Sequence, residues 1–191
     1  DFNKIEKFDY ILDALKNFKK PLIFELGVNL GGSTKRFLDY IKLNDGKLFS
    51  VDIKDCLNVT DDKNWKFLKS NDLKYKYIID KFPDIRNEGI DLLFIDSYHD
   101  PSHVKLLLDI WVKYMNKQGV IFLDDTESLP YELKKKFTHS VITDEIDKVV
   151  KEFYYQNSEQ FIYTKYFLGV GLSKLEKKTL KNEELTGTKV W

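Results

Sequence analysis

The chain alternates between short apolar runs and segments with a helical period, and this alternation constrains its fold more than any other feature. Segments such as STKRFLDYIKL (33–43) and HVKLLLDIWVKYM (103–115) place apolar residues on one helical face. Between such segments lie five apolar runs that predict strands: LIFEL (22–26), KLFSVDI (47–53), WKFLKSND (65–72), GIDLLFID (89–96) and VIFLDD (120–125). Strands that alternate with helices indicate an α/β fold with a doubly wound, mostly parallel sheet.

Acidic residues close most of the predicted strands. They are Glu25, Asp52, Asp96, Asp124 and Asp125. In a doubly wound sheet, ligands bind just beyond the carboxyl ends of the strands, so we expect these five carboxylates at one edge. Carboxylates brought this close repel one another unless cations or ligand donors lie among them. The pattern therefore indicates a binding site at this edge.

The composition favours one globular domain over residues 1–191. Lysine plus arginine equals aspartate plus glutamate at 31 each, so no net charge draws the molecule to nucleic acid. The single cysteine, Cys56, excludes an internal disulfide framework and a cysteine-based metal site. Without a membrane-length apolar run or a signal-peptide pattern, we expect a cytoplasmic protein with neither nucleic-acid nor membrane partners. The composition is compatible with a monomer and with a homo-oligomer.

Four parts are expected within this domain. An N-terminal helix lies in residues 1–20, and the cofactor and metal half spans 21–125. Substrate-side helices and a final strand hairpin are expected in 126–175, followed by a polar tail in 176–191. Trp111, Tyr114 and Met115 fall at helical spacing and are predicted to lie in the core.

A glycine turn, ELGVNLGGS (25–33), follows the first predicted strand. It lacks the G-x-G-x-x-G pattern because position 29 is asparagine, and no G-K-[ST] follows it. Gly27 and Gly31 allow a ligand close to the backbone, and Ser33 at the helix start suits a carboxylate. Asp52, at the end of the next strand, is placed to hold both hydroxyls of a ribose. These features fit NAD and S-adenosylmethionine alike.

The pattern E-x-G-x-x-x-G-x-S followed by V-D-I resembles motifs one and two of the class I S-adenosylmethionine-dependent methyltransferases. That family has a Rossmann-like seven-stranded sheet with an antiparallel final strand, which we expect the segment QFIYTKYFLGVGL (160–172) to help form. The resemblance implies these cofactor-binding residues: Glu25, Gly27, Gly31 and Ser33 at the methionine end, Asp52 at the ribose, Asn71 and Asp72 near the adenine, and Asp96.

A second set of residues suggests a metal and a base. Asp96, Asp124 and Asp125 offer oxygen ligands from rigid strand ends, which suits a hard divalent cation such as Mg²⁺. His99 lies three residues past Asp96, close enough to face the same pocket. A histidine of ordinary pKa can take the proton of a hydroxyl that a metal has acidified. His103, one turn further, is expected on the helix surface.

The pattern I-D-x-x-H-D together with D-D resembles the branch that contains the macrolide-sugar O-methyltransferases and the cephalosporin hydroxylase family, and more distantly catechol O-methyltransferase. The resemblance implies a magnesium-dependent O-methyltransferase whose metal ligands are Asp96, Asp124 and Asp125. It also implies His99 and Asp96 as catalytic residues. The acceptor implied is a hydroxyl of a sugar or glycosylated metabolite, in natural product biosynthesis.

Other functions share parts of this pattern. An NAD(P)-dependent oxidoreductase uses the same strand, loop and acid, but it has no role for the second acid cluster. A non-catalytic domain that binds S-adenosylmethionine or a partner chain fits the first half of the site alone. A hydroxylase is suggested only by the name of the cephalosporin hydroxylase family. The sequence shows no set of two histidines and one carboxylate that would bind iron for such a reaction.

Overall fold

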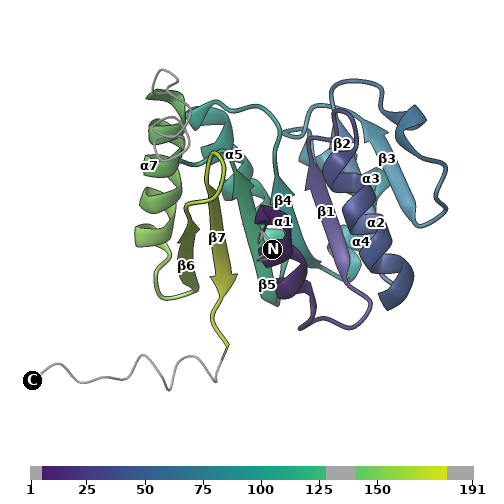
Figure 1. Ribbon diagram of the computed structural model, residues 1–191, viewed down its shortest axis with the longest axis horizontal. Coiled ribbons are helices and arrows are strands. Elements are labelled where there is room, and N and C mark those ends of the chain that lie inside the picture. The colour runs from purple at the N-terminus through teal and green to yellow at the C-terminus, as the bar shows by residue number, and fades with distance from the viewer. Residues whose placement is uncertain (1–5, 128–140, 180–191) are drawn as a thin grey trace, which may run out of the picture.

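The computed structural model describes residues 6–127 and 141–179 (Figure 1). It contains a seven-stranded sheet in the order β3-β2-β1-β4-β5-β7-β6. The strands are β1 (Leu22–Leu26), β2 (Lys47–Asp52), β3 (Trp65–Lys69), β4 (Ile90–Ile95), β5 (Met115–Asp124), β6 (Phe161–Tyr166) and β7 (Leu172–Lys177). Five strands pair in parallel, and β7 lies antiparallel between β5 and β6. The predicted doubly wound sheet with an antiparallel final strand is therefore confirmed.

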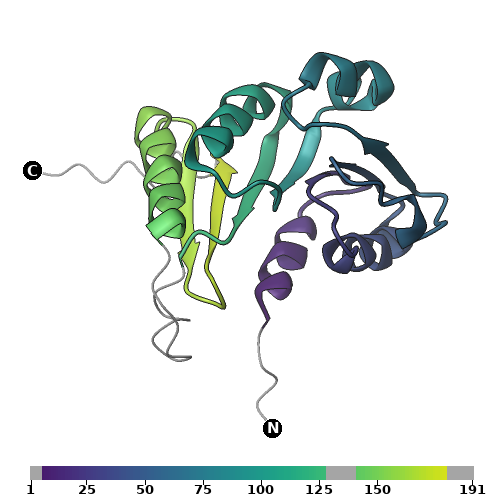
Figure 2. The same cartoon turned by 90° about the horizontal axis from the view of Figure 1, so that it is seen from above.

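Helices cover both faces of this sheet (Figure 2). The helices are α1 (Lys7–Leu15), α2 (Gly32–Asn44), α3 (Tyr75–Lys81), α4 (Asp84–Asn87), α5 (Pro101–Trp111) and α7 (Val141–Gln156), with 3-10 turns η1 (Leu57–Val59) and η2 (Val112–Tyr114). Side chains of α1 and α2 share one buried cluster with one face of the sheet. Those of α3, α4, α5 and α7 share the other. The strands are apolar on both sides because both faces are covered.

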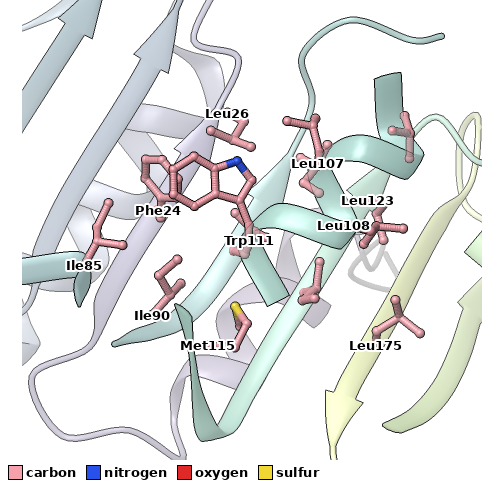
Figure 3. Close-up of a cluster of buried hydrophobic side chains, with 14 of the residues drawn as sticks. Phe24, Leu26, Ile85, Ile90, Leu107, Leu108, Trp111, Met115, Leu123 and Leu175 are labelled. Carbon is pink, nitrogen blue, oxygen red and sulfur yellow. The ribbon is translucent and has the colours of Figure 1, made fainter. Parts of the chain in front are cut away.

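Trp111 anchors the face that carries α5 (Figure 3). Its side chain is fully buried, and its ring meets that of Phe24 edge-on with the centroids 4.7 Å apart. The indole nitrogen donates a hydrogen bond to the carbonyl of Asp72 at 3.3 Å. Trp111 and Met115 are core residues as expected, and Trp111 also supports the chain just beyond β3.

The helix predicted over residues 103–115 ends earlier than expected. α5 stops at Trp111, a single 3-10 turn follows, and β5 begins at Met115, which pairs with Ile90. Gly119 lies inside β5, where an added Cβ would be 2.9 Å from the Ile90 carbonyl oxygen. A short apolar segment fits either element by its period, and here pairing with β4 decides for the strand.

The part of the chain beyond β5 agrees with the expected order where the structure describes it. α7 lies in the segment predicted to be helical, and β6 and β7 form the predicted hairpin. Residues 128–140, which include His139, and the tail from residue 180 lie outside the described residues. None of the helices in the described ranges is long and apolar enough to cross a membrane.

Candidate active site

The carboxyl ends of β1, β2, β3 and β4 surround a cavity of about 640 Å³. Its walls are formed by these residues: Gly27, Val28, Asn29, Val51, Asp52, Ile53, Lys54, Ser70, Asn71, Asp72, Asp96, Ser97, Tyr98, His99 and His103. The cavity therefore lies at the edge where the strand-end acids were expected to meet. Of the predicted cofactor residues, it brings together Gly27, Asp52, Asn71, Asp72 and Asp96.

Gly27 lets the loop after β1 lie against the end of β4. Its φ is +96°, and an added Cβ would lie 2.1 Å from the carbonyl oxygen of Asp96. No side chain fits at that distance, so glycine is required by space as well as by backbone conformation. Gly31, with a φ of +77°, is the residue before α2, and it packs against Val59 rather than lining the cavity.

Asp52 ties the same loop to the end of β2. Its Oδ2 accepts hydrogen bonds from the backbone N–H groups of Val28 at 2.8 Å and Asn29 at 3.0 Å. Its Oδ1 accepts one from Lys54 N at 2.8 Å. Burial alone raises the pKa of Asp52, but these three backbone donors outweigh it and lower that pKa below its usual value. Asp52 therefore presents a charged carboxylate to the cavity.

Glu25 lies beneath the cavity instead of lining it. Its side chain is fully buried and accepts hydrogen bonds from the hydroxyls of Ser33 at 2.5 Å, Thr34 at 2.8 Å and Ser50 at 2.7 Å. Burial raises the pKa of Glu25 to about 7, against the effect of these three hydroxyl donors. Glu25 and Ser33 thus bind each other and hold the start of α2 onto the sheet.

Ser33 lines a second hollow, of about 420 Å³. Its lining comes from α1, α2 and the turn between β6 and β7: Glu6, Lys7, Phe8, Gly32, Ser33, Arg36, Leu168 and Gly169. The expected set at the methionine end is therefore divided, with Gly27 at the larger cavity and Ser33 at this smaller one.

Asp96, His99 and Asp125 converge at the ends of β4 and β5. His99 Nε2 lies 3.6 Å from Asp96 Oδ1 and 3.6 Å from Asp125 Oδ2. One ligand atom from each residue lies within 4.8 Å of the other two. His99 Nε2 is shielded from solvent and has no hydrogen-bond partner among the described residues. A buried polar atom without a partner is costly, which indicates that a ligand completes this group.

The electrostatics of this group also favour a cation. Burial, together with the negative charges of Asp124 and Asp125, raises the pKa of Asp96 to about 8. Burial and the charge of Asp124 raise the pKa of Asp125 as well. Two carboxyl oxygens at this spacing, with the imidazole of His99 beside them, suit a hard divalent cation, which would remove the repulsion.

Asp124 is not part of this trio. Its Oδ1 forms an ion pair with Lys7 Nζ, and the same oxygen accepts a hydrogen bond from Asp125 N at 2.8 Å. No pattern in the sequence connects Lys7 with the strand-end acids, since 117 residues separate it from Asp124. Its place follows only from how α1 packs on the sheet.

His103 lines the cavity, so its expected position on the helix surface is wrong. Its Nε2 lies 3.0 Å from Asp72 Oδ1, and both side chains are nearly buried. The two atoms are at ion-pair distance without forming a well-aligned hydrogen bond. Asp100 caps α5 by accepting a hydrogen bond from His103 N at 2.9 Å, so His103 lies in the first turn of this helix.

The chain resembles methyltransferases in sequence and in fold. A family model described as a methyltransferase domain matches residues 24–126, which is more than half of the chain. The matched segment includes the glycine loop, Asp52, the Asp96–His99 segment and both acids after β5. No curated protein matches the chain significantly.

Three solved structures illustrate the likeness in fold. A candidate caffeoyl-CoA O-methyltransferase from Staphylococcus aureus is 15% identical with a TM-score of 0.67, over 91% of this chain and 85% of that one. The MycE methyltransferase from the mycinamycin biosynthetic pathway, in complex with Mg and SAH, is 17% identical with a TM-score of 0.67. That match covers all of this chain (100%) but only 54% of MycE, so this chain spans about half the length of that protein.

The third structure is a candidate rRNA methylase from Clostridium thermocellum. It is 15% identical with a TM-score of 0.63, over 93% of this chain and 100% of that one. At these identities the three structures agree with this chain in fold alone. Their likeness to this chain does not indicate which acceptor it methylates.

Proposed function

The chain belongs to the methyltransferase-domain family, and from this premise we propose that it is an S-adenosylmethionine-dependent O-methyltransferase assisted by a divalent cation. The observation that carries the proposal is the group formed by Asp96, His99 and Asp125, with the unpartnered Nε2 atom of His99 between two carboxylates. This group lies at the edge of a cavity whose other residues suit a nucleoside.

The cofactor is proposed to bind along this cavity. Asp52 holds the ribose, with one carboxylate oxygen fixed by two backbone donors of the glycine loop. Asn71 and Asp72 lie at the end of β3, where the adenine is proposed to bind. The tight approach of Gly27 to Asp96 brings the methionine end close to the acid group. S-Adenosylmethionine would supply a methyl group on a sulfonium, an electrophile that a deprotonated hydroxyl attacks.

The cation is proposed to bind Asp96 and Asp125, with His99 beside it. A divalent ion there would acidify the hydroxyl of the acceptor and stabilise its negative charge. His99 Nε2 accepts the hydroxyl proton, because it is the unpartnered basic atom among the described residues of the group. The carboxylates on either side, each 3.6 Å from Nε2, then stabilise the imidazolium. Asp124 is proposed to act indirectly, through its contacts with Lys7 and Asp125.

A sugar hydroxyl is the proposed acceptor. Support comes from the I-D-x-x-H-D and D-D patterns, and from the fold shared with MycE, which was also solved with Mg, SAH and mycinamycin VI. The family assignment does not favour an NAD(P)-dependent oxidoreductase. A domain that only binds a ligand would have no use for the buried base in the group of Asp96, His99 and Asp125.

Transfer of labelled methyl groups tests this proposal. The protein is incubated with S-adenosylmethionine and a panel of sugar and catechol hydroxyl acceptors, with EDTA or with added Mg²⁺. We expect transfer that EDTA abolishes and Mg²⁺ restores, and that His99→Ala reduces by about a hundredfold or more. Full activity in EDTA would refute the cation. Binding of NADH in preference to S-adenosylhomocysteine would refute the methyl donor.

A further inference from the structure

Lys7 places a positive charge beside the strand-end carboxylates Asp124 and Asp125. Its Nζ forms an ion pair with Asp124 Oδ1 and lies 3.9 Å from Asp125 Oδ1. The other oxygen of Asp125, Oδ2, is the one that faces His99. Asp125 is therefore positioned between an ammonium on one side and an imidazole on the other.

Apolar packing of α1, rather than the ion pair, sets the position of Lys7. The ring of Phe8 lies 5.1 Å from that of Phe37 and 5.9 Å from that of Phe94, measured between centroids. Ile11 and Leu15 are fully buried in the same cluster, on the face of the sheet that carries α2 (Figure 2). Contacts of this kind hold the helix in place whether or not the ammonium is present.

The ammonium changes both the ligands and the charge that a cation would meet. It occupies the Asp124 oxygen, so the described ligand atoms that lie together come from Asp96, His99 and Asp125. When a cation binds and all three carboxyl groups are ionised, Lys7 leaves two uncompensated negative charges, which one divalent ion neutralises. Without Lys7 there would be three, and Asp124 would be free to turn toward the ion.

We propose that Lys7 is an internal counter-cation that keeps Asp124 from binding the cation. It thereby sets the net charge of the cation site and its affinity for the ion. The inference rests on the cation site of the proposed function. It assigns Lys7 an electrostatic role that neither the family match nor the sequence motifs include. Lys7 thus limits how tightly the site holds a cation.

Calorimetric titration with Mn²⁺, in the absence of cofactor and acceptor, tests this role in the whole chain. Lys7→Met removes the charge and keeps the length of the side chain. We expect it to tighten Mn²⁺ binding about tenfold, since one unit charge beside a divalent ion is lost. Tb³⁺ should gain more than Mn²⁺, because a trivalent ion gains more from an extra negative charge. Lys7→Arg should bind Mn²⁺ within about threefold of the unaltered chain.

Lys16→Met is the matched control, because Lys16 directly follows the same helix and, in the described part of the chain, its ammonium pairs with the exposed Asp13. It removes an equal charge away from the acid group and should leave Mn²⁺ affinity unchanged. Weaker or unaltered Mn²⁺ binding by Lys7→Met overturns the inference, and the first result would assign Lys7 to holding the ligands in place. If neither the unaltered chain nor Lys7→Met binds Mn²⁺ at millimolar concentration, the cation of the proposed function fails as well.

Discussion

His99 Nε2 lies 3.6 Å from Asp125 Oδ2, although the two residues follow different strands. The pairing of β4 with β5 brings Ile95 opposite Leu123, so the residues just beyond the two strands meet at one edge. Asp125 then adopts a φ of +53°, a left-handed conformation that is uncommon outside glycine. A non-glycine residue held there at a site of clustered charge supports a functional role for its side chain.

Asp125→Asn should weaken Mn²⁺ binding about ten- to hundredfold while leaving S-adenosylhomocysteine affinity within about threefold. The amide keeps the size of the side chain but loses the charge that a hard cation requires. Calorimetric titration of each ligand measures the two effects separately. Asp109→Asn is the control, because Asp109 is an exposed partner of Lys105 on α5. Equal Mn²⁺ affinity in Asp125→Asn and the unaltered chain would remove Asp125 from the cation site.

Asp52→Asn should weaken cofactor binding and leave cation binding unchanged, the reverse of the result expected for Asp125→Asn. The amide can still accept one of the loop hydrogen bonds, but it no longer offers a charged acceptor to the ribose or to the N–H groups of Val28 and Asn29. S-Adenosylhomocysteine affinity should fall about ten- to hundredfold, with Mn²⁺ affinity unchanged. Asp55→Asn provides the control, since Asp55 is an exposed residue in the segment just after β2. A cofactor affinity that does not change would mean that the ribose binds elsewhere.

The fold followed from the sequence because its strands carry strong local signals. Apolar runs bounded by acids and turns placed β1, β2, β4 and the second half of β5 correctly, and their alternation with helices indicated a mostly parallel sheet. The first half of β5 was missed, because its polar residues between Met115 and Gly119 resemble a helix end. Only the pairing with Ile90, which is not local, makes that segment a strand.

The site was predictable only as far as strand ends determine it. That Asp96, His99 and Asp125 meet follows from strand order, and the sequence indicated it. Whether a side chain points into the cavity or beneath it depends on packing, which is why the burial of Glu25 behind three hydroxyls was not foreseen. Lys7 shows the same limit, since no sequence pattern connects α1 with β5.

Gly27→Ala should destabilise the fold by about 3 kcal/mol or more. The added Cβ would lie 2.1 Å from the Asp96 carbonyl oxygen, and the φ of +96° is unfavourable for alanine. Gly32→Ala is a matched control in the same loop, because an added Cβ there meets nothing within 4 Å. Alanine favours a helix over glycine, so this control should be neutral or more stable by up to about 1 kcal/mol. Denaturant unfolding measures both, and equal midpoints for the two variants would contradict the close approach.

The buried carboxyl of Glu25 should make the free energy of unfolding depend on pH. Its pKa is about 7 in the folded chain against an ordinary value of 4.5. Below the ordinary value the group is neutral in both states, and its full contribution to stability is present. As the pH rises toward 7, the unfolded chain loses the proton more readily than the folded chain, so stability falls. The loss levels off above pH 7 at about 3 kcal/mol.

Glu25→Gln isolates this contribution, because Asp96 and Asp125 also have raised pKa values and add to the slope of the unaltered chain. The glutamine is neutral at every pH. Its amide oxygen, in the place of Oε2, can accept the hydrogen bonds from Thr34 and Ser50, while its NH₂ group donates to the Ser33 hydroxyl. Urea unfolding between pH 5 and pH 8 should therefore show a shallower fall in stability for Glu25→Gln. Glu159→Gln, at an exposed position, should keep the slope of the unaltered chain. Parallel curves for Glu25→Gln and the unaltered chain would mean that Glu25 keeps an ordinary pKa, with its three hydroxyl donors fully offsetting its burial.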